Sequence, residues 1–174
     1  METERLYLRQ RTRQRLKHIL DQSISEQLTF FGFENVNELR SELAKIEKHL
    51  ATENTDRTKW DLVEKSTQLI IGSCSFFNWA QQHERAEIGY SLFEKYRGKG
   101  FMHEALKRII DYGFGEMRLN RIEAFMEPGN EPSKRMIKKL GFKQEGVLRE
   151  HYRSADKIHD SIVFSLLRSD YQQE

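Results

Sequence analysis

The sequence predicts one α+β domain built on a mixed, mostly antiparallel sheet with helices on its faces. Strand-like segments come first, a strand-helix-strand crossover follows in the middle, and further strands close the chain. The 174 residues include only two prolines and show no internal repeat or low-complexity linker. We therefore expect a single domain over residues 1–174.

Alternating apolar residues mark the strands of the predicted sheet. We expect strands at residues 5–10, 60–63, 69–79, 86–93, 121–126, 142–153 and 157–168. The second and third, joined by the polar turn EKST, are expected to form an antiparallel hairpin.

Apolar residues spaced three and four apart predict the helices, at residues 12–21, 36–50, 101–117 and 130–140. Thr12 is placed to cap the first helix, and Asn35 or Asn37 to cap the second. Pro132 lies in the first turn of the last helix, and Gly141 is expected to end it in a left-handed conformation.

Charge and cysteine content narrow the class of protein. The 29 basic and 27 acidic residues give a net charge of +2, too small to predict nucleic-acid binding. The amino terminus has no long apolar run, so neither a signal peptide nor a membrane span is expected. The single Cys74 fits a reducing compartment such as the cytoplasm. Arginines alternate with polar residues near the amino terminus, at Arg9, Arg11, Arg13 and Arg15. Such a pattern is typical of an RNA-binding arm or, more commonly, of a solvated strand end and first helical turn.

Two glycines separate a predicted strand from a predicted helix in the stretch EKYRGKGFMHEA. Gly98 and Gly100 lack a Cβ atom and tolerate positive φ, so a ligand can approach the main chain. The first helical turn presents unpaired N–H groups at the positive end of the helix dipole. A pyrophosphate is therefore a candidate ligand of Arg97, Gly98, Lys99, Gly100, Phe101 and Met102. Such a turn is by itself more often structural, and it matches neither nucleotide motif GxxxxGK[ST] nor GxGxxG.

A second motif, EPGNEPSKRMIKKLGFKQEG, follows the next predicted strand. Together with EIGYSLFEKYRGKGFMHEA it resembles the two motif regions of the GCN5-related N-acetyltransferases, within them the RimJ/RimL-type branch that acetylates protein amino termini. The opening TERLYLRQ and the closing HDSIVFSLL are similar to that branch, so the resemblance covers nearly the whole chain. It implies about seven strands, splayed at the centre, with about four helices on the two faces.

The resemblance also implies a cofactor, acetyl-coenzyme A, whose pyrophosphate would lie on the main-chain amides of residues 97–102. The central strand would splay from residues 121–126 and bind the pantetheine arm through Ile88, Gly89, Tyr90, Ser91 and Leu92. Asn130 would bind the pantetheine as well, although it is equally suited to a turn or a helix cap. Lys95 departs from the family pattern, which usually has Gln or Arg there.

Direct attack of an amine on the thioester needs a proton acceptor and a group near the leaving sulfur. By resemblance Ser133 is the hydroxyl near the sulfur, and a second helix cap is its alternative role. Glu87 is the candidate that takes the amine's proton, and a strand-end ion pair with Arg85 is its alternative. Glu104 is expected to stabilise the helix dipole.

Several other reactive or aromatic side chains receive no catalytic role. Cys74 lies in a buried strand pattern, and His103 is only a titratable group near the cofactor end. His151 and His159 lack the companions of a metal motif, so no metal site is expected. The aromatic residues that either border the acceptor pocket or belong to the core are Phe30, Phe31, Phe33, Phe76, Phe77 and Trp79.

The resemblance implies an acetyl-coenzyme A-dependent transferase acting on the N-terminal α-amine of a protein such as a ribosomal protein. By resemblance the chain is also expected to form a homodimer, the common oligomeric state of the family. Two alternatives stay open. The acceptor can be a small amine such as a polyamine, an amino acid or an antibiotic, or the chain can be a catalytically silent sensor that binds acetyl-coenzyme A.

Overall fold

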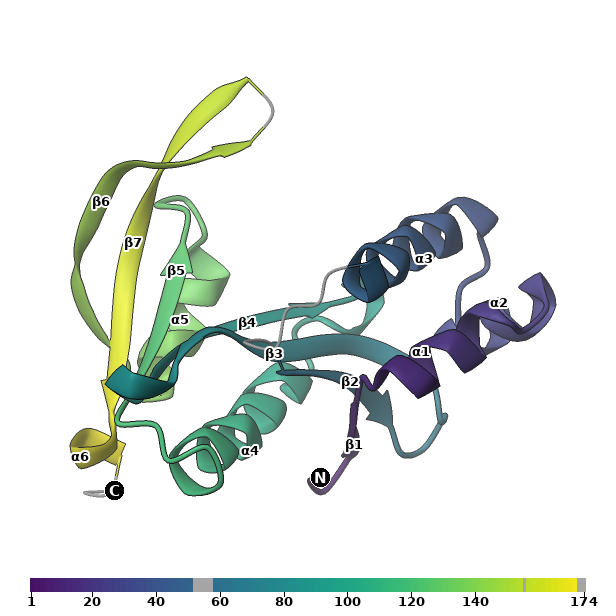
Figure 1. Cartoon of the computed structure of the whole chain (residues 1–174), viewed down its shortest axis with the longest axis horizontal. Coiled ribbons are helices and arrows are strands. Elements are labelled where there is room, and N and C mark those ends of the chain that lie inside the picture. Colours follow the sequence, from purple (N-terminus) through teal and green to yellow (C-terminus); the bar gives the residue numbers. More distant parts are fainter. Residues whose placement is uncertain (52–57, 155, 172–174) are drawn as a thin grey trace. The chain divides into compact units, whose positions relative to one another are not determined.

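The computed structural model describes residues 1–51, 58–154 and 156–171 (Figure 1). These residues form seven strands, β1 (Leu6–Gln10), β2 (Thr58–Glu64), β3 (Ile70–Ala80), β4 (Arg85–Leu92), β5 (Arg121–Met126), β6 (Lys143–Ser154) and β7 (Lys157–Leu167). They also form six α-helices, α1 (Arg13–Leu20), α2 (Ile24–Phe31), α3 (Val36–Ala51), α4 (Phe101–Gly115), α5 (Glu131–Lys139) and α6 (Arg168–Tyr171). Two short 3₁₀ turns are η1 (Gln81–His83) and η2 (Glu94–Tyr96).

The strands form one sheet in the order β1-β2-β3-β4-β5-β7-β6. β4 and β5 pair in parallel, whereas β1 with β2, β5 with β7 and β6 with β7 pair antiparallel. The parallel pair is joined by the crossover through α4, as the central strand-helix-strand pattern requires. The predicted α+β class with a mixed, mostly antiparallel sheet is confirmed.

The helices differ from the prediction in number, since the described residues contain six where about four were expected. α2 was missed although Ser23 and Glu26 form a capping box at its start and Gly32, with φ of +63°, ends it. α6 has only four residues, too few to show a helical period. The expected caps at Thr12 and Asn35 are present, because Thr12 accepts a hydrogen bond from the Arg15 amide and Asn35 accepts one from the Asn37 amide.

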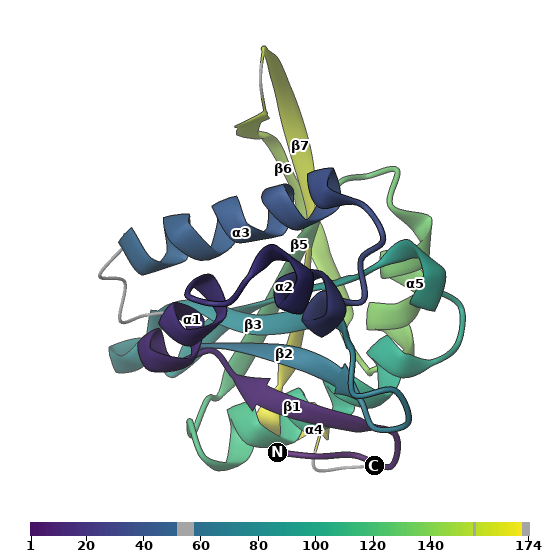
Figure 2. The same ribbon diagram turned by 90° about the vertical axis from the view of Figure 1, so that its right-hand side faces the viewer.

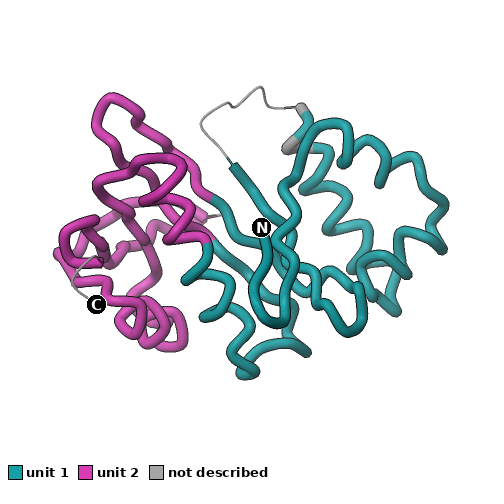
Figure 3. Tube along the Cα trace, turned by 90° about the horizontal axis from the view of Figure 1, so that it is seen from below, with its two compact units in different colours: residues 1–75, 90–108 teal, residues 76–89, 109–174 magenta. Residues whose placement is uncertain are grey.

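The chain divides into two compact units, drawn in different colours in Figure 3. The first contains Met1–Ser75 and Tyr90–Arg108, and the second contains Phe76–Gly89 and Ile109–Glu174. β3, β4 and α4 each contribute residues to both units. The single domain expected over residues 1–174 stays a prediction.

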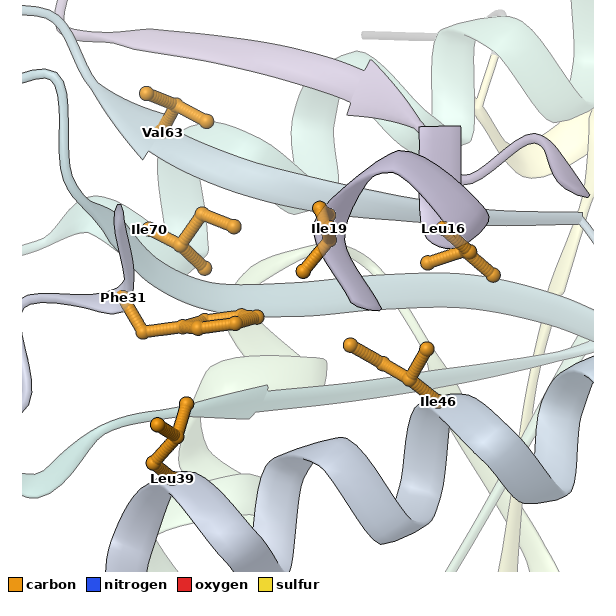
Figure 4. Packing of buried hydrophobic residues seen from close by; sticks show 7 residues of the cluster. All are labelled: Leu16, Ile19, Phe31, Leu39, Ile46, Val63 and Ile70. Atoms are coloured by element: carbon orange, nitrogen blue, oxygen red, sulfur yellow. The ribbon is translucent and has the colours of Figure 1, made fainter. Parts of the chain in front are cut away.

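In the first unit, α1, α2 and α3 cover one face of β1–β3, and α4 begins on the other side (Figure 2). Their apolar sides meet the sheet in one buried cluster (Figure 4), formed by Leu16, Ile19, Phe31, Leu39, Ile46, Val63 and Ile70. Fully burying a side chain of this size stabilises the fold by roughly 1.5–3 kcal/mol. The apolar residues spaced three and four apart in these helices are therefore the ones that pack against the sheet.

A buried ion network in the same unit corrects the interpretation of Arg11 as a solvated residue. Its Nε donates to Asp61 at 2.5 Å and its Nη2 to Glu42 at 2.8 Å, with only 2% of the side chain exposed. Burial opposes the charge of Arg11, but the two carboxylates raise its pKa above the ordinary value. Removing one member of such a buried pair typically costs about 3–5 kcal/mol. Arg11 is thus a core residue, and the partners that bury it lie 31 and 50 residues away.

In the second unit, β5 pairs with β7 along its whole length, and β6 continues the sheet beyond β7 (Figure 1). α5 packs beside β5 and is followed by Gly141, whose φ of +85° is the left-handed conformation expected there. Glu123 lies buried on β5 between two arginines, at 2.7 Å from Arg85 and 2.8 Å from Arg121. These ion pairs fix the start of the parallel β4–β5 ladder.

Gly72 allows β3 to approach the end of β4 closely. A Cβ atom at this position would lie 2.3 Å from the carbonyl oxygen of Ser91 and 3.0 Å from the Cα atom of Leu92. Both neighbours are main chain, so they cannot move aside by a rotamer change. The glycine therefore sets the spacing of the strand that leads into the glycine turn.

We predict that Gly72→Ala lowers the free energy of unfolding by about 1–3 kcal/mol, the usual cost of overpacking. Urea denaturation followed by circular dichroism measures the change. Gly146→Ala is the matched control, because a Cβ there meets nothing within 4 Å. Equal effects of the two substitutions would contradict the argument.

Candidate active site

The glycine turn lies in the first unit, between β4 and α4. The chain leaves β4 at Leu92, passes through η2 and reaches Gly98 and Gly100, which have φ values of +75° and +81°. α4 then begins at Phe101. A Cβ atom on Gly98 would meet nothing within 4 Å, so the main chain there faces open space. The order of strand, glycine turn and helix is the one that the sequence predicted.

The amides of the turn are open to a ligand over most of its length. The Arg97 N–H donates to the Glu94 carbonyl at 3.0 Å, and the first bond inside the helix runs from Glu104 N–H to the Gly100 carbonyl at 3.2 Å. Between them, the N–H groups of residues 98–103 have no acceptor within the described part of the chain. Five of the six residues expected to offer amides therefore have them free, and Arg97 retains only its guanidinium for a ligand.

The cations beside the turn have different surroundings. Arg97 directs Nε toward the Leu92 carbonyl at 3.4 Å and stays exposed. Lys99 Nζ lies 5.7 Å from the ring centre of Tyr96. Lys95, which departs from the family pattern, donates to the carbonyl of Gly32 at 2.7 Å. Lys95 is thus engaged by the loop after α2.

Arg5, for which the sequence predicted no role, contacts the glycine turn from the segment just before β1. Arg5 donates from Nε to Glu104 at 2.7 Å and from Nη1 to the Lys99 carbonyl at 3.0 Å. Its guanidinium lies over the ring of Phe101, 4.6 Å from the centre. Thr3 donates to the same Glu104 carboxylate. Glu104 therefore ties the start of the chain to the helix, a larger role than the dipole contact expected for it.

A cavity of about 470 Å³ also lies in the first unit, beneath α3 and beside the end of β4. Carboxylates, cations and hydroxyls line it together with two aromatic rings: Glu38, Glu42, Glu94, Arg11, Lys45, Lys59, Arg97, Ser41, Ser73, Ser91, Phe33 and Phe93. Of the aromatic residues considered for an acceptor pocket, Phe33 lines this cavity, whereas Phe31 and Phe76 are fully buried core residues.

The second unit holds the other predicted site residues, beginning with β4 and β5. Their parallel ladder joins residues 85–87 to residues 121–123, and within the described residues its register ends there. Ile88 and Gly89 continue β4 beyond the ladder, and β5 runs on to Met126. The edge of β5 that faces β4 is therefore left without strand pairing over its last three residues, as expected for splayed strands.

Glu87 and its neighbours show a different pairing from the expected one. Glu87 accepts a hydrogen bond from Asn78 at 2.8 Å, while Arg85 pairs with Glu123. The alternative role of Glu87 in a strand-end ion pair with Arg85 is wrong, because the register places Glu123 beside both arginines. Glu87 stays half-buried, and its second carboxylate oxygen has no hydrogen-bond partner among the residues that the structure describes.

Asn130 and Ser133 lie at the start of α5. Asn130 caps the helix by accepting a hydrogen bond from the Ser133 amide at 3.2 Å, so its structural role is confirmed. The Ser133 hydroxyl is half-buried and makes no hydrogen bond to the residues that the structure describes. It does not serve as a second cap and is free to act on a ligand.

Other titratable groups of this unit form a cluster that the sequence did not reveal. The Tyr152 hydroxyl donates to Glu127, which raises the pKa of Tyr152, and the Tyr152 ring stacks on His159 at 5.0 Å. His151 Nδ1 lies 2.9 Å from the Ser161 hydroxyl.

In the first unit, burial raises the pKa of the Cys74 thiol, which fits its lack of a catalytic role.

Known proteins are similar to this chain in sequence, and they belong to one family. The family description "Acetyltransferase (GNAT) domain" matches residues 5–143. The uncharacterized N-acetyltransferase p20 of Bacillus licheniformis is 36% identical over 151 residues, which cover 87% of this chain and 84% of that protein. YoaA of Bacillus subtilis, an uncharacterized N-acetyltransferase, is 33% identical over 97% of this chain and 96% of its own length.

Solved structures share the fold over almost the whole chain. A chimera of the spermidine N-acetyltransferase SpeG from Vibrio cholerae superposes with a TM-score of 0.72 at 22% identity, covering 98% of this chain and all of that one. An acetyltransferase of the GNAT family from Bacillus anthracis gives a TM-score of 0.71 at 23% identity, covering 97% and 98%. The fold is that of an acetyltransferase. The chain belongs to the GCN5-related N-acetyltransferase (GNAT) family and is an acyltransferase.

The carboxylate of Glu104 makes stability depend on pH. Partial burial opposes its charge, but hydrogen bonds from Thr3 and from the main and side chain of Arg5 hold its pKa below the ordinary value. A carboxylate with a lowered pKa in the folded state stabilises the fold above its unfolded pKa, about 4.3 for Glu, and this contribution is lost as pH falls through the folded pKa.

We predict that Glu104→Gln lowers the melting temperature at pH 7 and that its difference from the parent chain narrows as pH falls below about 4. Thermal unfolding between pH 7 and pH 3 measures this. Glu4→Gln, an exposed neighbour, should change the melting temperature little at any pH. A difference that stays constant over the whole range would show that the charge of Glu104 contributes nothing.

Proposed function

We propose that this chain transfers the acetyl group of acetyl-coenzyme A to the N-terminal α-amine of a protein, such as a ribosomal protein, by direct attack. The observation that carries the cofactor proposal is the row of free amides at residues 98–102. Positive φ at two glycines and open space at Gly98 leave room for a diphosphate against those amides. The residues therefore fit the cofactor that GNAT enzymes use.

The remaining cofactor contacts follow the family pattern. Residues 88–92 offer main-chain groups to the pantetheine arm, as the end of the β4–β5 ladder at Glu87 suggests. Asn130 contributes through its side-chain amide, since its cap uses only the oxygen. The Ser133 hydroxyl lies at the N-terminal turn of α5, where helix amides favour negative charge on a leaving group.

Acetyl-coenzyme A supplies an activated acetyl thioester when it is bound. Glu87 accepts a proton from the amine directly or through water, using the oxygen that Asn78 leaves free. The amine nitrogen forms a bond to the acetyl carbon, the carbon–sulfur bond breaks, and the sulfur leaves as thiolate. The Ser133 hydroxyl donates a hydrogen bond to that sulfur and can pass a proton to it, which is then replaced from water.

The protein acceptor is supported by similarity to a known enzyme. The ribosomal protein uS5-alanine N-acetyltransferase of Escherichia coli is 31% identical over 111 residues, which cover 63% of this chain and 57% of that enzyme. A cytoplasmic location agrees with the single buried Cys74 and with a ribosomal acceptor. No helix in the described residues is long and apolar enough to cross a membrane. The homodimer expected from family habit stays a prediction.

A second candidate function is acetylation of a small cationic amine. The exposed carboxylates of Glu38 and Glu94 line the cavity of the first unit and are placed to contact a polyamine or a similar cation, whereas Glu42 is paired with Arg11 and Lys45. Steady-state assays of thiol release from acetyl-coenzyme A, run in parallel on peptides with free α-amines and on spermidine-like amines, separate the two acceptors. Cofactor binding without turnover on any amine would instead support a silent sensor, and absence of binding would reject all three.

We predict that Gly98→Asp weakens coenzyme A binding about tenfold or more relative to Gly98→Ala, because it puts a carboxylate beside the phosphates. Both substitutions carry a similar strain at positive φ, and neither Cβ meets a neighbour. Isothermal titration calorimetry gives the two dissociation constants. Equal affinities would place the diphosphate elsewhere.

We predict that Ser133→Ala lowers kcat roughly 10²-fold while the dissociation constant for coenzyme A changes little. The helix cap survives, because Asn130 bonds to the main chain of residue 133. Ser169→Ala, an exposed serine of α6, is the control and should leave kcat unchanged. Undiminished turnover in Ser133→Ala would remove this hydroxyl from the mechanism.

A further inference from the structure

Arg5 is held in a fixed orientation beside the glycine turn. Glu104 accepts hydrogen bonds from its Nε at 2.7 Å and from its main-chain N–H at 2.8 Å. Nη1 donates to the Lys99 carbonyl at 3.0 Å, and the ring of Phe101 supports the face of the guanidinium at 4.6 Å. All four contacts thus involve residues of the turn itself or of the first helical turn after it.

The third nitrogen of this guanidinium is available to a ligand. Nη2 has no hydrogen-bond acceptor among residues 1–51, 58–154 and 156–171, and 43% of the side chain is exposed. A Cβ atom built on Gly100 would lie 3.3 Å from Nη2, so this nitrogen borders the main chain of the turn. The free amides of residues 98–102 and one free guanidinium nitrogen therefore lie on the same short stretch.

A guanidinium with two nitrogens fixed and one free is suited to an anion at the turn. Arginine always carries its charge, and its planar fork gives short, charge-assisted hydrogen bonds to phosphate oxygens. Helix amides favour an anion but supply no formal charge. Arg97 and Lys99, the cations expected from the sequence, are exposed, and no carboxylate of the described residues holds either side chain toward the turn.

We infer that Arg5 is a cofactor-binding residue whose Nη2 donates to the diphosphate of coenzyme A, and that Glu104 is the positioning residue that orients it. This inference rests on the proposed cofactor and adds a residue from the start of the chain to its site. The Thr3 hydroxyl bonds to the same carboxylate and is a structural residue of this cluster.

The test compares Arg5→Gln with the parent chain on three ligands in binding experiments. Coenzyme A and dephospho-coenzyme A both contain the diphosphate, whereas pantetheine contains no phosphate. We expect Arg5→Gln to bind the first two about 10- to 100-fold more weakly, the range for a hydrogen bond to a charged group. Binding of pantetheine should change less than about twofold, the usual scatter for a substitution that does not contact the ligand.

Each outcome of this comparison has a fixed meaning. A loss confined to coenzyme A would assign Arg5 to the 3′-phosphate and overturn the inference. An equal loss on all three ligands would show that Arg5 only maintains the fold, and no loss would show that it has no role in binding. If the parent chain binds none of the three, the proposed function itself fails, which separates the two failures.

Two further variants keep the test independent of folding. Thr3→Val removes a structural bond of the same cluster but leaves the contacts of Arg5 to Glu104 and Lys99, so it should lower the melting temperature and leave coenzyme A affinity within about twofold. Arg5→Lys keeps the charge without the planar fork, so it should weaken binding of both diphosphate ligands and leave binding of pantetheine unchanged. Parent-like affinity of Arg5→Lys for all three ligands would overturn the inference.

Discussion

The site depends on one constraint, a short stretch of main chain whose amides are not used by the protein itself. A helix leaves its first N–H groups without partners, and here two glycines prevent side chains from covering them. The rest of the first unit supports this stretch from both ends. Gly72 sets the spacing of the strand that enters it, and Glu104 fixes the helix that leaves it.

Charge is distributed differently from what a list of basic residues suggests. Arg11 forms buried ion pairs with Asp61 and Glu42, and Lys95 donates a hydrogen bond to the carbonyl of Gly32. Arg5, one more arginine near the start of the chain, is held at the surface beside the glycine turn. Formal charge in the sequence therefore says little until the acceptors of each cation are known.

Local pattern predicted much of this molecule, and long-range contact explains the rest. The strand period, the cap at Thr12 and the left-handed Gly141 depend on neighbours within a few residues, so they could be read directly. The buried state of Arg11 and the contact of Arg5 with residue 99 join segments 31 to 94 residues apart, which no periodicity encodes. Asn130 shows the remaining difficulty, because a residue type suited to a cap is equally suited to a ligand.

The bond between Thr3 and Glu104 spans 101 residues and bears on synthesis of the chain. Thr3 leaves the ribosome before its acceptor Glu104 is made, so this bond cannot form while the strands between them are still emerging. Contacts of high sequence separation form late because a long loop must first be closed. Nascent chains that stop before residue 104 should therefore contain a helical and sheet core without a finished cofactor turn.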